Sequence, residues 1–267
     1  MSPISHKRTP RFLLPEAHTQ GQRLPLNGDQ LHHACRVLRL RNGQPLRAWN
    51  GDGLEFQAIL HTQDNTHAWV VLDGAAQPLE HAELRRSIGV LQALPESDKM
   101  DWVLEKCTEL GASSFYPVQA QRSVVRLDAN RLSKRHAHWE RVVVSASLQS
   151  ERGRLAVIHP CTPLEEQLAR LKTKHPDVQL LWFSPEAKLT LIEWLQQSPG
   201  LAPSNPNAPW VICVGPEGGW TPQERELAEK EGAVALQFAP RVLRTETFAM
   251  ACIAQLTGLL KLDPPLR

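Results

Sequence analysis

The residues best suited to binding a small ligand lie where an apolar run meets a glycine-rich loop. The run Trp-Val-Ile-Cys-Val (210–214) is followed directly by Gly215, Pro216, Glu217, Gly218 and Gly219. Because glycine lacks a side chain, backbone amides in such a loop can approach a ligand closely. In open parallel sheets, ligands bind just beyond the carboxyl ends of the strands, which is where this loop is expected. A tight turn with positive φ is the competing explanation of the same glycines.

The residues after this loop predict the start of a helix, and the motifs that the loop lacks narrow the choice of ligand. Thr221 can be the N-cap, Pro222 fits the first helical position, and Glu224 completes a capping box. No Gly-Lys-Ser/Thr follows, so the loop is not a phosphate-binding P-loop, and it lacks the Gly-x-Gly-x-x-Gly pattern of dinucleotide sites. The common nucleotide cofactors are therefore disfavoured.

A second segment whose residues could take part in binding or catalysis lies about twenty residues further on. A short strand expected over 233–238 ends in a loop with two arginines, and Thr245 can cap a final helix over 246–261. That helix is apolar nearly all round, so it must be covered on more than one side; its own sheet is one cover, and a partner chain is a candidate for the other. Glu246 is either a proton acceptor or simply an acid favourably placed at a helix N-terminus.

Cations are clustered along the chain although the net charge is only +2. Residues 32–47 hold four arginines and no acid, and residues 122–154 hold eight Lys/Arg against three acids. Clusters of this kind are the electrostatic footprint of a phosphate backbone. A solvated basic face is the alternative explanation.

Two differently built parts of the chain must position these segments. Residues 11–75 contain short strand-like runs separated by turn formers, with a short helix near 32–38, which indicates a small β-barrel. From about Leu79, apolar runs alternate with helical stretches, which indicates an α/β domain with a doubly wound, mostly parallel sheet. We expect domains over 1–76 and 79–267, with a linker at 75–78. The strands expected in the second domain are 86–94, 114–118, 178–183 and 210–214, and the helices are 98–110, a long one ending near Ser150, and 189–197.

Several classes of protein are excluded or disfavoured. No apolar run is long enough for a transmembrane helix, and the N-terminal residues lack the apolar stretch of a signal peptide, so we expect a cytoplasmic protein. The five cysteines are odd in number and far apart, which favours reduced, buried side chains over a disulfide framework or a zinc site. The adjacent His32 and His33 diverge on a helix and have no third ligand, so we expect no metal.

The two loops together carry a resemblance to a known family. Val-Gly-Pro-Glu-Gly-Gly (214–219) and Pro-Arg-Val-Leu-Arg-Thr-Glu-Thr (240–247) resemble the paired cofactor loops of bacterial 16S ribosomal RNA (uridine-N3) methyltransferases. That family belongs to the SPOUT class of knotted methyltransferases. Other stretches agree in order and spacing, so the resemblance spans nearly the whole chain: Arg11-Phe12, His32-His33, residues 37–40, Lys99-Met100-Asp101, Lys106, Glu109-Leu110-Gly111 and Arg122-Ser123.

The resemblance implies a fold, a cofactor and partners. It implies a PUA-like RNA-binding barrel, a C-terminal domain with a deep trefoil knot, a homodimer, and S-adenosylmethionine bound in the knot. The partner implied is 16S ribosomal RNA within the small ribosomal subunit, with no membrane. The cofactor-binding residues implied are Val214, Gly215, Pro216, Glu217, Gly218, Gly219, Phe238, Leu243, Arg244 and Thr245.

Methylation of uracil N3 requires removal of a weakly acidic proton and stabilisation of the resulting anion. We expect Arg244 or Arg152 to stabilise the anion and Glu246 to accept the proton. The cations expected to contact RNA are Arg11, Arg36, Arg39, Arg41, Arg122, Arg152 and Arg154.

Some residues depart from the family pattern, and rival functions remain open. The family has Leu-Gly where this chain has Phe238-Ala239, and residues 148–154 retain only part of the family's polar stretch, with departures at Leu148, Glu151 and Gly153. The rivals are a non-catalytic RNA-binding protein, a SPOUT methyltransferase that acts on another RNA, and an unrelated nucleotide-binding α/β enzyme.

Overall fold

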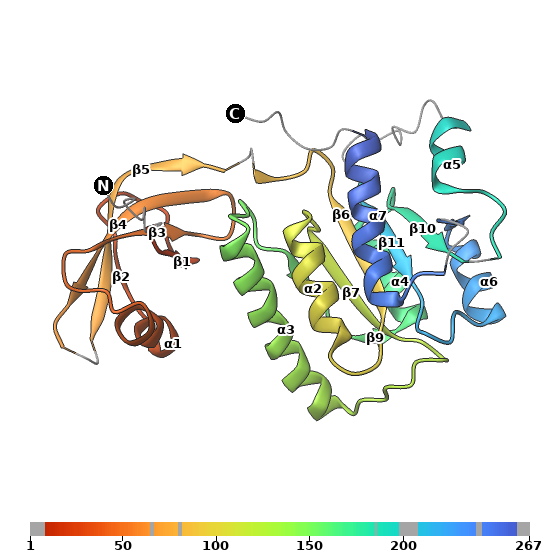
Figure 1. Ribbon diagram of the computed structural model, residues 1–267, viewed down its shortest axis with the longest axis horizontal. Helices are drawn as coiled ribbons and strands as arrows, with labels where there is room; N and C mark the ends of the chain where they lie inside the picture. The colour runs from red at the N-terminus through yellow and green to blue at the C-terminus, as the bar shows by residue number, and fades with distance from the viewer. Residues whose placement is uncertain are drawn as a thin grey trace, which may run out of the picture. The chain divides into compact units, whose positions relative to one another are not determined.

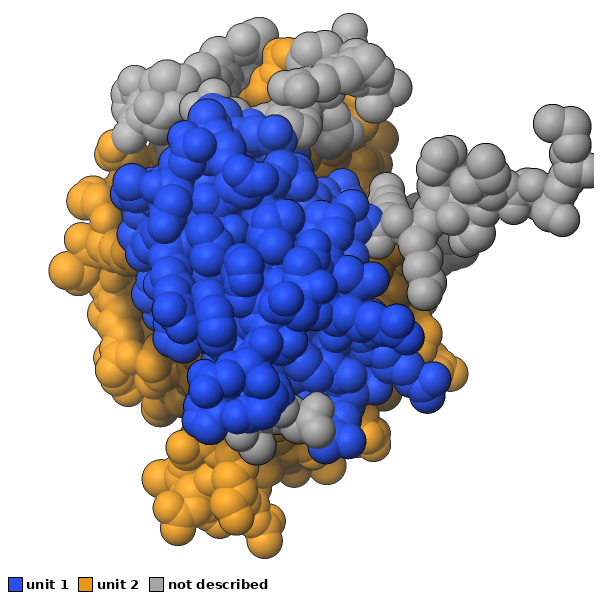
Figure 2. All heavy atoms as spheres, turned by 90° about the vertical axis from the view of Figure 1, so that its left-hand side faces the viewer, with its two compact units in different colours: residues 1–82, 151–155 blue, residues 83–150, 156–267 orange. Residues whose placement is uncertain are grey.

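The computed structural model describes residues 9–64, 67–79, 82–184, 186–197, 208–238 and 242–260. The chain forms two compact units, which Figure 2 shows in different colours. Unit 1 contains residues 1–82 and 151–155, and unit 2 contains residues 83–150 and 156–267. The short segment 151–155 thus belongs to unit 1 although its neighbours in the chain on both sides belong to unit 2.

Unit 1 is built on a curled five-stranded sheet with the strand order β1-β3-β4-β5-β2 (Figure 1). Its strands are β1 (Arg11–Leu13), β2 (Arg23–Pro25), β3 (Pro45–Trp49), β4 (Leu54–Thr62) and β5 (Ala68–Pro78). β1 pairs with β3 in parallel, and the other pairs are antiparallel. Alternate residues of β4 and β5 face a core that includes Phe56, Leu60, Val70 and Leu72. This confirms the all-β expectation for the N-terminal part.

The helical part of unit 1 lies between β2 and β3. α1 (Gly28–His32) begins at Asn27, whose side chain accepts a hydrogen bond from the Gln30 backbone, and continues into a π-helical turn, η1 (His33–Val37). A helix near residues 32–38 was therefore correctly predicted, although it begins earlier.

The prediction of a linker at 75–78 is wrong. These residues are the end of β5, where Gln77 pairs with Glu55 and Pro78 pairs with Leu54. The small and polar side chains resemble a linker, but this end of the strand is largely exposed, so the register with β4 holds it without an apolar pattern. The edge strand β2 was not predicted, because three residues carry too little pattern.

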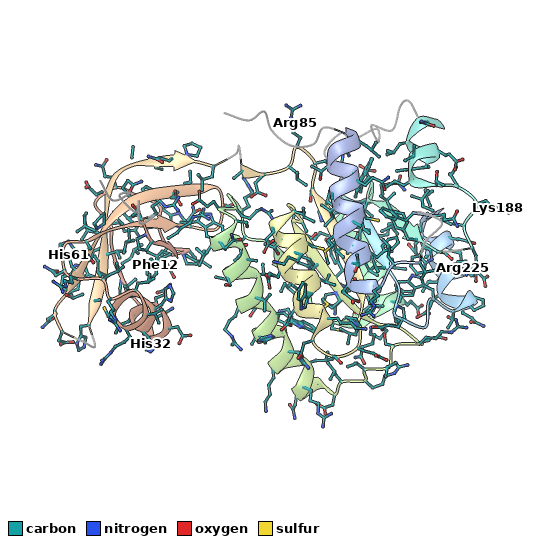
Figure 3. The ribbon with its side chains drawn as sticks, in the orientation of Figure 1. Phe12, His32, His61, Arg85, Lys188 and Arg225 are labelled. Carbon is teal, nitrogen blue, oxygen red and sulfur yellow. The ribbon has the colours of Figure 1, made fainter. Side chains whose placement is uncertain are left out.

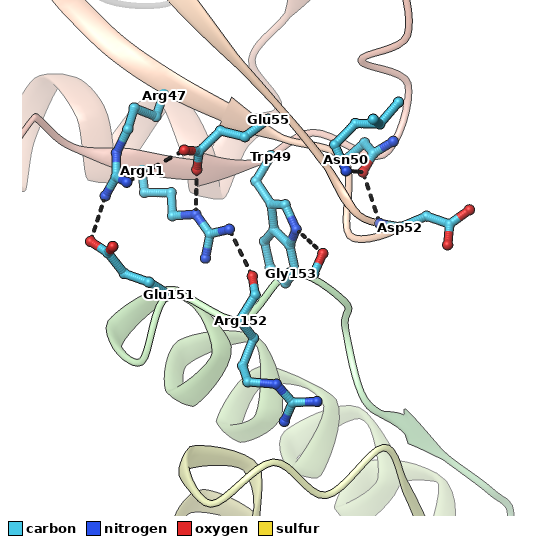
Figure 4. A network of polar contacts seen from close by, with 10 residues as sticks. Arg11, Arg47, Trp49, Asn50, Asp52, Glu55, Glu151, Arg152 and Gly153 are labelled. Atoms are coloured by element: carbon cyan, nitrogen blue, oxygen red, sulfur yellow. Dashed lines mark hydrogen bonds and ion pairs between the residues drawn. The ribbon is translucent and has the colours of Figure 1, made fainter. Parts of the chain in front are cut away.

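Polar contacts attach the segment 151–155 to the sheet of unit 1 (Figure 4). Trp49 Nε1 donates to the Gly153 carbonyl at 2.7 Å, and Arg47 forms an ion pair with Glu151 at 2.9 Å. A Cβ atom at Gly153 would lie 2.5 Å from the Leu79 carbonyl oxygen, so this position requires glycine. Glu151 and Gly153, two of the departures from the family pattern, therefore have structural roles within unit 1.

Unit 2 contains a parallel sheet with the strand order β12-β10-β11-β6-β7-β8, and β9 also pairs with β7. The strands are β6 (Ile88–Ala93), β7 (Ser114–Gln119), β8 (Val157–Ile158), β9 (Thr162–Pro163), β10 (Gln179–Phe183), β11 (Trp210–Val214) and β12 (Val234–Leu236). The central strands β6 and β11 are buried along their whole length. The four apolar runs predicted as strands are confirmed, as is a short strand within 233–238.

Helices cover both faces of this sheet (Figure 1). They are α2 (Lys99–Glu109), α3 (Ala129–Gln149), α4 (Leu164–Lys174), α5 (Leu191–Gln197), α6 (Pro222–Lys230) and α7 (Thr245–Leu260). α2 contacts both α3 and α7, whereas α4 packs against β7 and α6. The doubly wound α/β architecture is thus confirmed. α4 was not predicted, and α7 begins at Thr245 rather than after it.

Some expectations lie outside the described residues. The second cofactor loop, expected over residues 240–247, falls partly on residues 239–241, which are not described, and the knot stays a prediction. Among the described helices, none combines the length and apolar character needed to cross a membrane.

Candidate active site

The glycine-rich loop lies at the carboxyl end of β11, between the neighbouring strands β10 and β6. The Gly219 N–H donates to the Pro216 carbonyl at 2.8 Å, and Gly219 has a φ of 69°. A Cβ atom at Gly215 would lie 3.0 Å from Trp220 Nε1, whose ring stacks on Trp182 at 4.3 Å. The loop therefore contains the tight turn that was the competing explanation, and it also lines a cavity.

The start of α6 holds the loop after β7 beside the glycine-rich loop. Thr221 and Glu224 form the predicted capping box, with the Thr221 hydroxyl accepting from the Glu224 backbone at 3.2 Å. The buried Glu224 carboxylate also accepts from the backbone N–H of Gln121 at 2.8 Å. This contact fixes the loop after β7, from which Arg122 donates to the Gly218 carbonyl at 3.1 Å. Arg122 is exposed and lies at the cavity.

A buried hydrogen-bond chain joins the two predicted cofactor loops. Thr245 Oγ1 donates to the Gly215 carbonyl at 2.8 Å and accepts from Gln92 Nε2 at 2.9 Å. Gln92 is 0% exposed near the end of β6 and also donates to the Ala93 carbonyl at 2.9 Å. Thr245 was predicted as a helix cap, but its hydroxyl instead connects the loops. Sequence reasoning missed Gln92, although a polar residue within a buried apolar run was a usable signal.

The loops line a cavity of about 750 Å³ in unit 2, which is open to solvent on one side. Three phenylalanines form an apolar wall, with the Phe248 ring centroid 5.0 Å from that of Phe183 and 5.1 Å from that of Phe238. The structure brings all ten residues expected to bind the cofactor to this cavity: Val214, Gly215, Pro216, Glu217, Gly218, Gly219, Phe238, Leu243, Arg244 and Thr245. The volume is within the usual range for small-molecule sites.

An ion pair fixes the rim of the cavity. Lys99 Nζ lies 2.7 Å from Glu217 Oε1, which also accepts from the Glu96 backbone at 3.1 Å. Partial burial opposes ionisation of Glu217, but the hydrogen bonds, chiefly from Lys99, outweigh it and lower the pKa of this carboxyl. The same hydrogen bond raises the pKa of Lys99, to which Glu246 also contributes by its charge. Glu217 is therefore anionic and tied to the start of α2.

The residues expected to act in catalysis are only partly brought together. Arg244 is exposed at the cavity, and Glu246 follows two residues later in the first turn of α7. Glu246 Oε2 is buried and has no hydrogen-bond partner among the described residues. Arg152 is buried and belongs to unit 1, whereas the cavity lies in unit 2.

The cations expected to contact RNA fall into two groups. Arg36, Arg39 and Arg41 are exposed around the end of η1, and Arg154 is exposed, with Asp52 at 3.1 Å. Arg11 is buried, and its guanidinium donates to Glu55 and to the Arg152 carbonyl, both at 2.7 Å (Figure 4). Arg11 and Arg152 are both buried, so neither side chain lies open to an RNA phosphate as the structure stands.

The thiols and potential metal ligands do not form a second reactive centre in the described part of the chain. Cys107, Cys213 and Cys252 are buried, and desolvation raises the pKa of each thiol. Burial also raises the pKa of Cys161 to about 12. Within the described residues, no three His, Cys, Asp or Glu side chains gather as a metal ion would require.

Comparisons with known proteins agree with this arrangement. Residues 82–257 match the model of an RNA methyltransferase domain, and residues 26–72 match that of an RNA methyltransferase PUA domain. The ribosomal RNA small subunit methyltransferase E of Synechocystis is 32% identical over 87% of this chain and 72% of its own. The protein of the same name from Bacillus subtilis is 29% identical over 89% of this chain and 92% of its own.

A solved structure extends the similarity to the fold. The ribosomal RNA small subunit methyltransferase E of Neisseria gonorrhoeae, bound to S-adenosylmethionine, is 30% identical and superposes with a TM-score of 0.80. The alignment covers 94% of this chain and 98% of that protein. The chain described here therefore belongs to the RNA methyltransferase family that includes the ribosomal RNA small subunit methyltransferases E.

Proposed function

We propose that this protein transfers a methyl group from S-adenosylmethionine to N3 of a uridine in 16S ribosomal RNA of the small ribosomal subunit. The observation that carries the proposal is the cavity at the ends of β11 and β12, whose two loops are joined through Thr245 and Gly215. The names of the relatives support an RNA of the small subunit, and the solved relative supports the cofactor. A ribosomal RNA substrate implies a cytoplasmic enzyme.

The cavity has features suited to S-adenosylmethionine. Its wall of Phe183, Phe238 and Phe248 offers apolar surface for an adenine ring, and the glycine-rich loop offers backbone groups for its polar edges. A Cβ atom at Gly219 would meet nothing within 4 Å, so the backbone there borders open space that a ligand can approach. Val214, Leu243 and the remaining predicted residues would complete the contacts.

The chemistry places specific demands on the side chains at the cavity. S-adenosylmethionine supplies a methyl group on a positively charged sulfur, which a nucleophile can attack. Uracil N3 becomes such a nucleophile once its proton leaves, and the ring oxygens then carry negative charge. Arg244 at the cavity would stabilise this charge, and Glu246 would accept the proton. Arg152 was the other candidate for the anion, but it is buried and is not among the residues that line the cavity, which favours Arg244.

Exposed cations would hold the RNA. Arg36, Arg39 and Arg41 of unit 1 would contact phosphates, as would Arg154 and, at the cavity, Arg122. Phosphate contacts fix the register and contribute most of the affinity, but they do not select a base. Because N3 lies on the base-pairing edge, the target uridine must be unpaired or flipped out.

The enzyme would act as a homodimer. The predicted partner surface is α7, where Thr247, Ala254, Gly258 and Leu259 are exposed. Trp102 of the neighbouring helix α2 is 61% exposed. A tryptophan and a mostly apolar helix face left open to water favour burial against a second copy.

Two measurements test this function against its rivals. Calorimetry should show binding of S-adenosylmethionine to the purified protein, whereas a non-catalytic RNA-binding protein would show none. Arg244→Ala should reduce the single-turnover rate on bound RNA by roughly a hundredfold, as loss of one anion-stabilising donor does, and leave RNA affinity nearly unchanged. Arg36→Ala is the matched control, because it should weaken RNA binding and reduce its salt dependence by about one ion. Loss of RNA binding with an unchanged rate in Arg244→Ala would contradict the assignment.

A further inference from the structure

A π-helical turn follows α1 in unit 1, directly after His32, which Figure 3 labels, and we refer to residues 36–41 as the arginine turn. The chain widens there into the π-helical η1, and the Leu38 N–H donates to the His33 carbonyl at 2.9 Å. Arg39 then takes a φ of 53°, a conformation that costs free energy for a residue with a side chain. The π-helical turn and the positive φ are both features that concentrate at functional sites.

Two apolar side chains of the arginine turn are exposed instead of packing into the core of unit 1. Val37 is 57% exposed and Leu38 is 37% exposed, whereas Ala34, one turn earlier, is fully buried and anchors the helix to the core. Single exposed apolar residues are common on soluble proteins. Two adjacent ones in a strained turn form a small exposed apolar surface, which we refer to as the apolar tip.

Positive charge surrounds this apolar tip. Arg36, Arg39 and Arg41 are all exposed, and none of them forms an ion pair among the described residues. The sequence contains no acid between Asp29 and Asp52. An apolar tip within unneutralised cations complements an RNA strand, because phosphates pair with the cations while base faces are apolar.

We propose that Val37 and Leu38 insert against unstacked bases of the RNA, while the three arginines of the arginine turn hold the flanking phosphates. The inference rests on the proposed function, since it concerns how the same RNA substrate is bound. Apolar side chains act in this way in proteins that wedge between base steps. The tip would thus select RNA whose bases are already splayed, such as a loop or bulge, over a regular duplex.

The test separates the apolar contribution from the charge contribution. Val37→Ser combined with Leu38→Ser removes the apolar tip and keeps every arginine. Affinity for 16S ribosomal RNA, measured by fluorescence anisotropy, should fall about tenfold at each salt concentration, because the apolar surface that two aliphatic side chains bury against the bases is lost. The slope of log affinity against log salt should stay unchanged, since no cation is lost. Arg36→Ala should instead reduce that slope by about one.

Two controls keep the test sharp. Val157→Ser, which changes a valine that is 51% exposed in unit 2, should leave RNA affinity unchanged. The melting temperature of the double variant should stay within about 1 °C of the wild type, because both side chains are exposed.

Each remaining outcome decides the matter. Unchanged RNA affinity in the double variant would overturn the inference, and unchanged affinity with a halved molecular mass would assign the tip to contact with a second copy. A reduced salt slope would overturn it too, because the change would then act through the arginines. Failure of the proposed function is distinguishable, since the wild-type protein would then transfer no methyl group to uridine N3 of 16S ribosomal RNA, whatever the RNA affinity of the double variant.

Discussion

Replacing Thr245 by valine should weaken cofactor binding by separating the two loops of the cavity. The Thr245 hydroxyl donates to the Gly215 carbonyl at 2.8 Å and accepts from Gln92 Nε2 at 2.9 Å, and the residue is buried. Valine has nearly the same shape but makes neither bond. Gln92 retains its bond to the Ala93 carbonyl, so the main loss is the partner of the Gly215 carbonyl.

The expected size follows from these two bonds. A buried group left without its partner costs about 1–3 kcal/mol, so the free energy of unfolding should fall by about 2 kcal/mol. For a chain of this size that lowers the melting temperature by about 4–8 °C. Because the Gly215 carbonyl belongs to the cofactor loop, the Kd for S-adenosylmethionine should rise about tenfold, equivalent to about 1.4 kcal/mol.

Calorimetry of S-adenosylmethionine binding and thermal unfolding are the two assays for this variant. Thr245→Ser is the matched control, because it keeps the hydroxyl and should bind within about twofold of the wild type. If Thr245→Val binds the cofactor as tightly as the wild type while melting earlier, the hydroxyl only stabilises the fold. In that case the hydrogen bond between the two loops does not shape the cofactor site.

Three further predictions concern separate features. Gly219→Val should abolish binding of S-adenosylmethionine in calorimetry, because Gly219 has a φ of 69° and the new side chain enters the open space of the cavity. Circular dichroism should show that the protein stays folded, and unchanged affinity for the cofactor would remove this loop from the site. Burial, with nearby Lys174 adding repulsion, lowers the pKa of His159 to about 4, so stability should fall as the pH drops from about 6.5 towards 4. Between pH 7 and pH 5, the free energy of unfolding measured in urea should therefore fall by about 1 kcal/mol less in His159→Phe than in the wild type, after discounting for partial exposure. Equal losses in the two proteins would contradict this reasoning. Light scattering at micromolar protein should give twice the chain mass of 30.0 kDa, and the monomer mass would refute the dimer.

The elements that position the site could be predicted because their patterns are local. The all-apolar run 210–214 is typical of a strand buried on both faces, and Thr221 with Glu224 specifies where the next helix begins. The glycine-rich loop between them then has only one place in a parallel sheet. The ten cofactor residues themselves were expected from the family resemblance rather than from these local patterns, and all ten line one cavity.

The features that were missed depend on residues far apart in the sequence. Gln92 contacts Thr245, 153 positions away, and a single sequence contains no sign of that partner. Arg11 resembled a surface cation, but its partners Glu55 and the Arg152 carbonyl are 44 and 141 positions away and keep it buried. Local pattern reports which face of an element is apolar, whereas the pairing of buried polar groups is decided by the tertiary fold.

The most direct test of the central claim is nucleoside mass spectrometry of 16S ribosomal RNA. Small ribosomal subunits from a strain that lacks this gene would be incubated with the purified protein and isotopically labelled S-adenosylmethionine. The proposed function predicts one labelled methyl group per 16S ribosomal RNA, recovered as N3-methyluridine, and none with Gly219→Val. Label on another base, on a ribose hydroxyl, or absent altogether would contradict it.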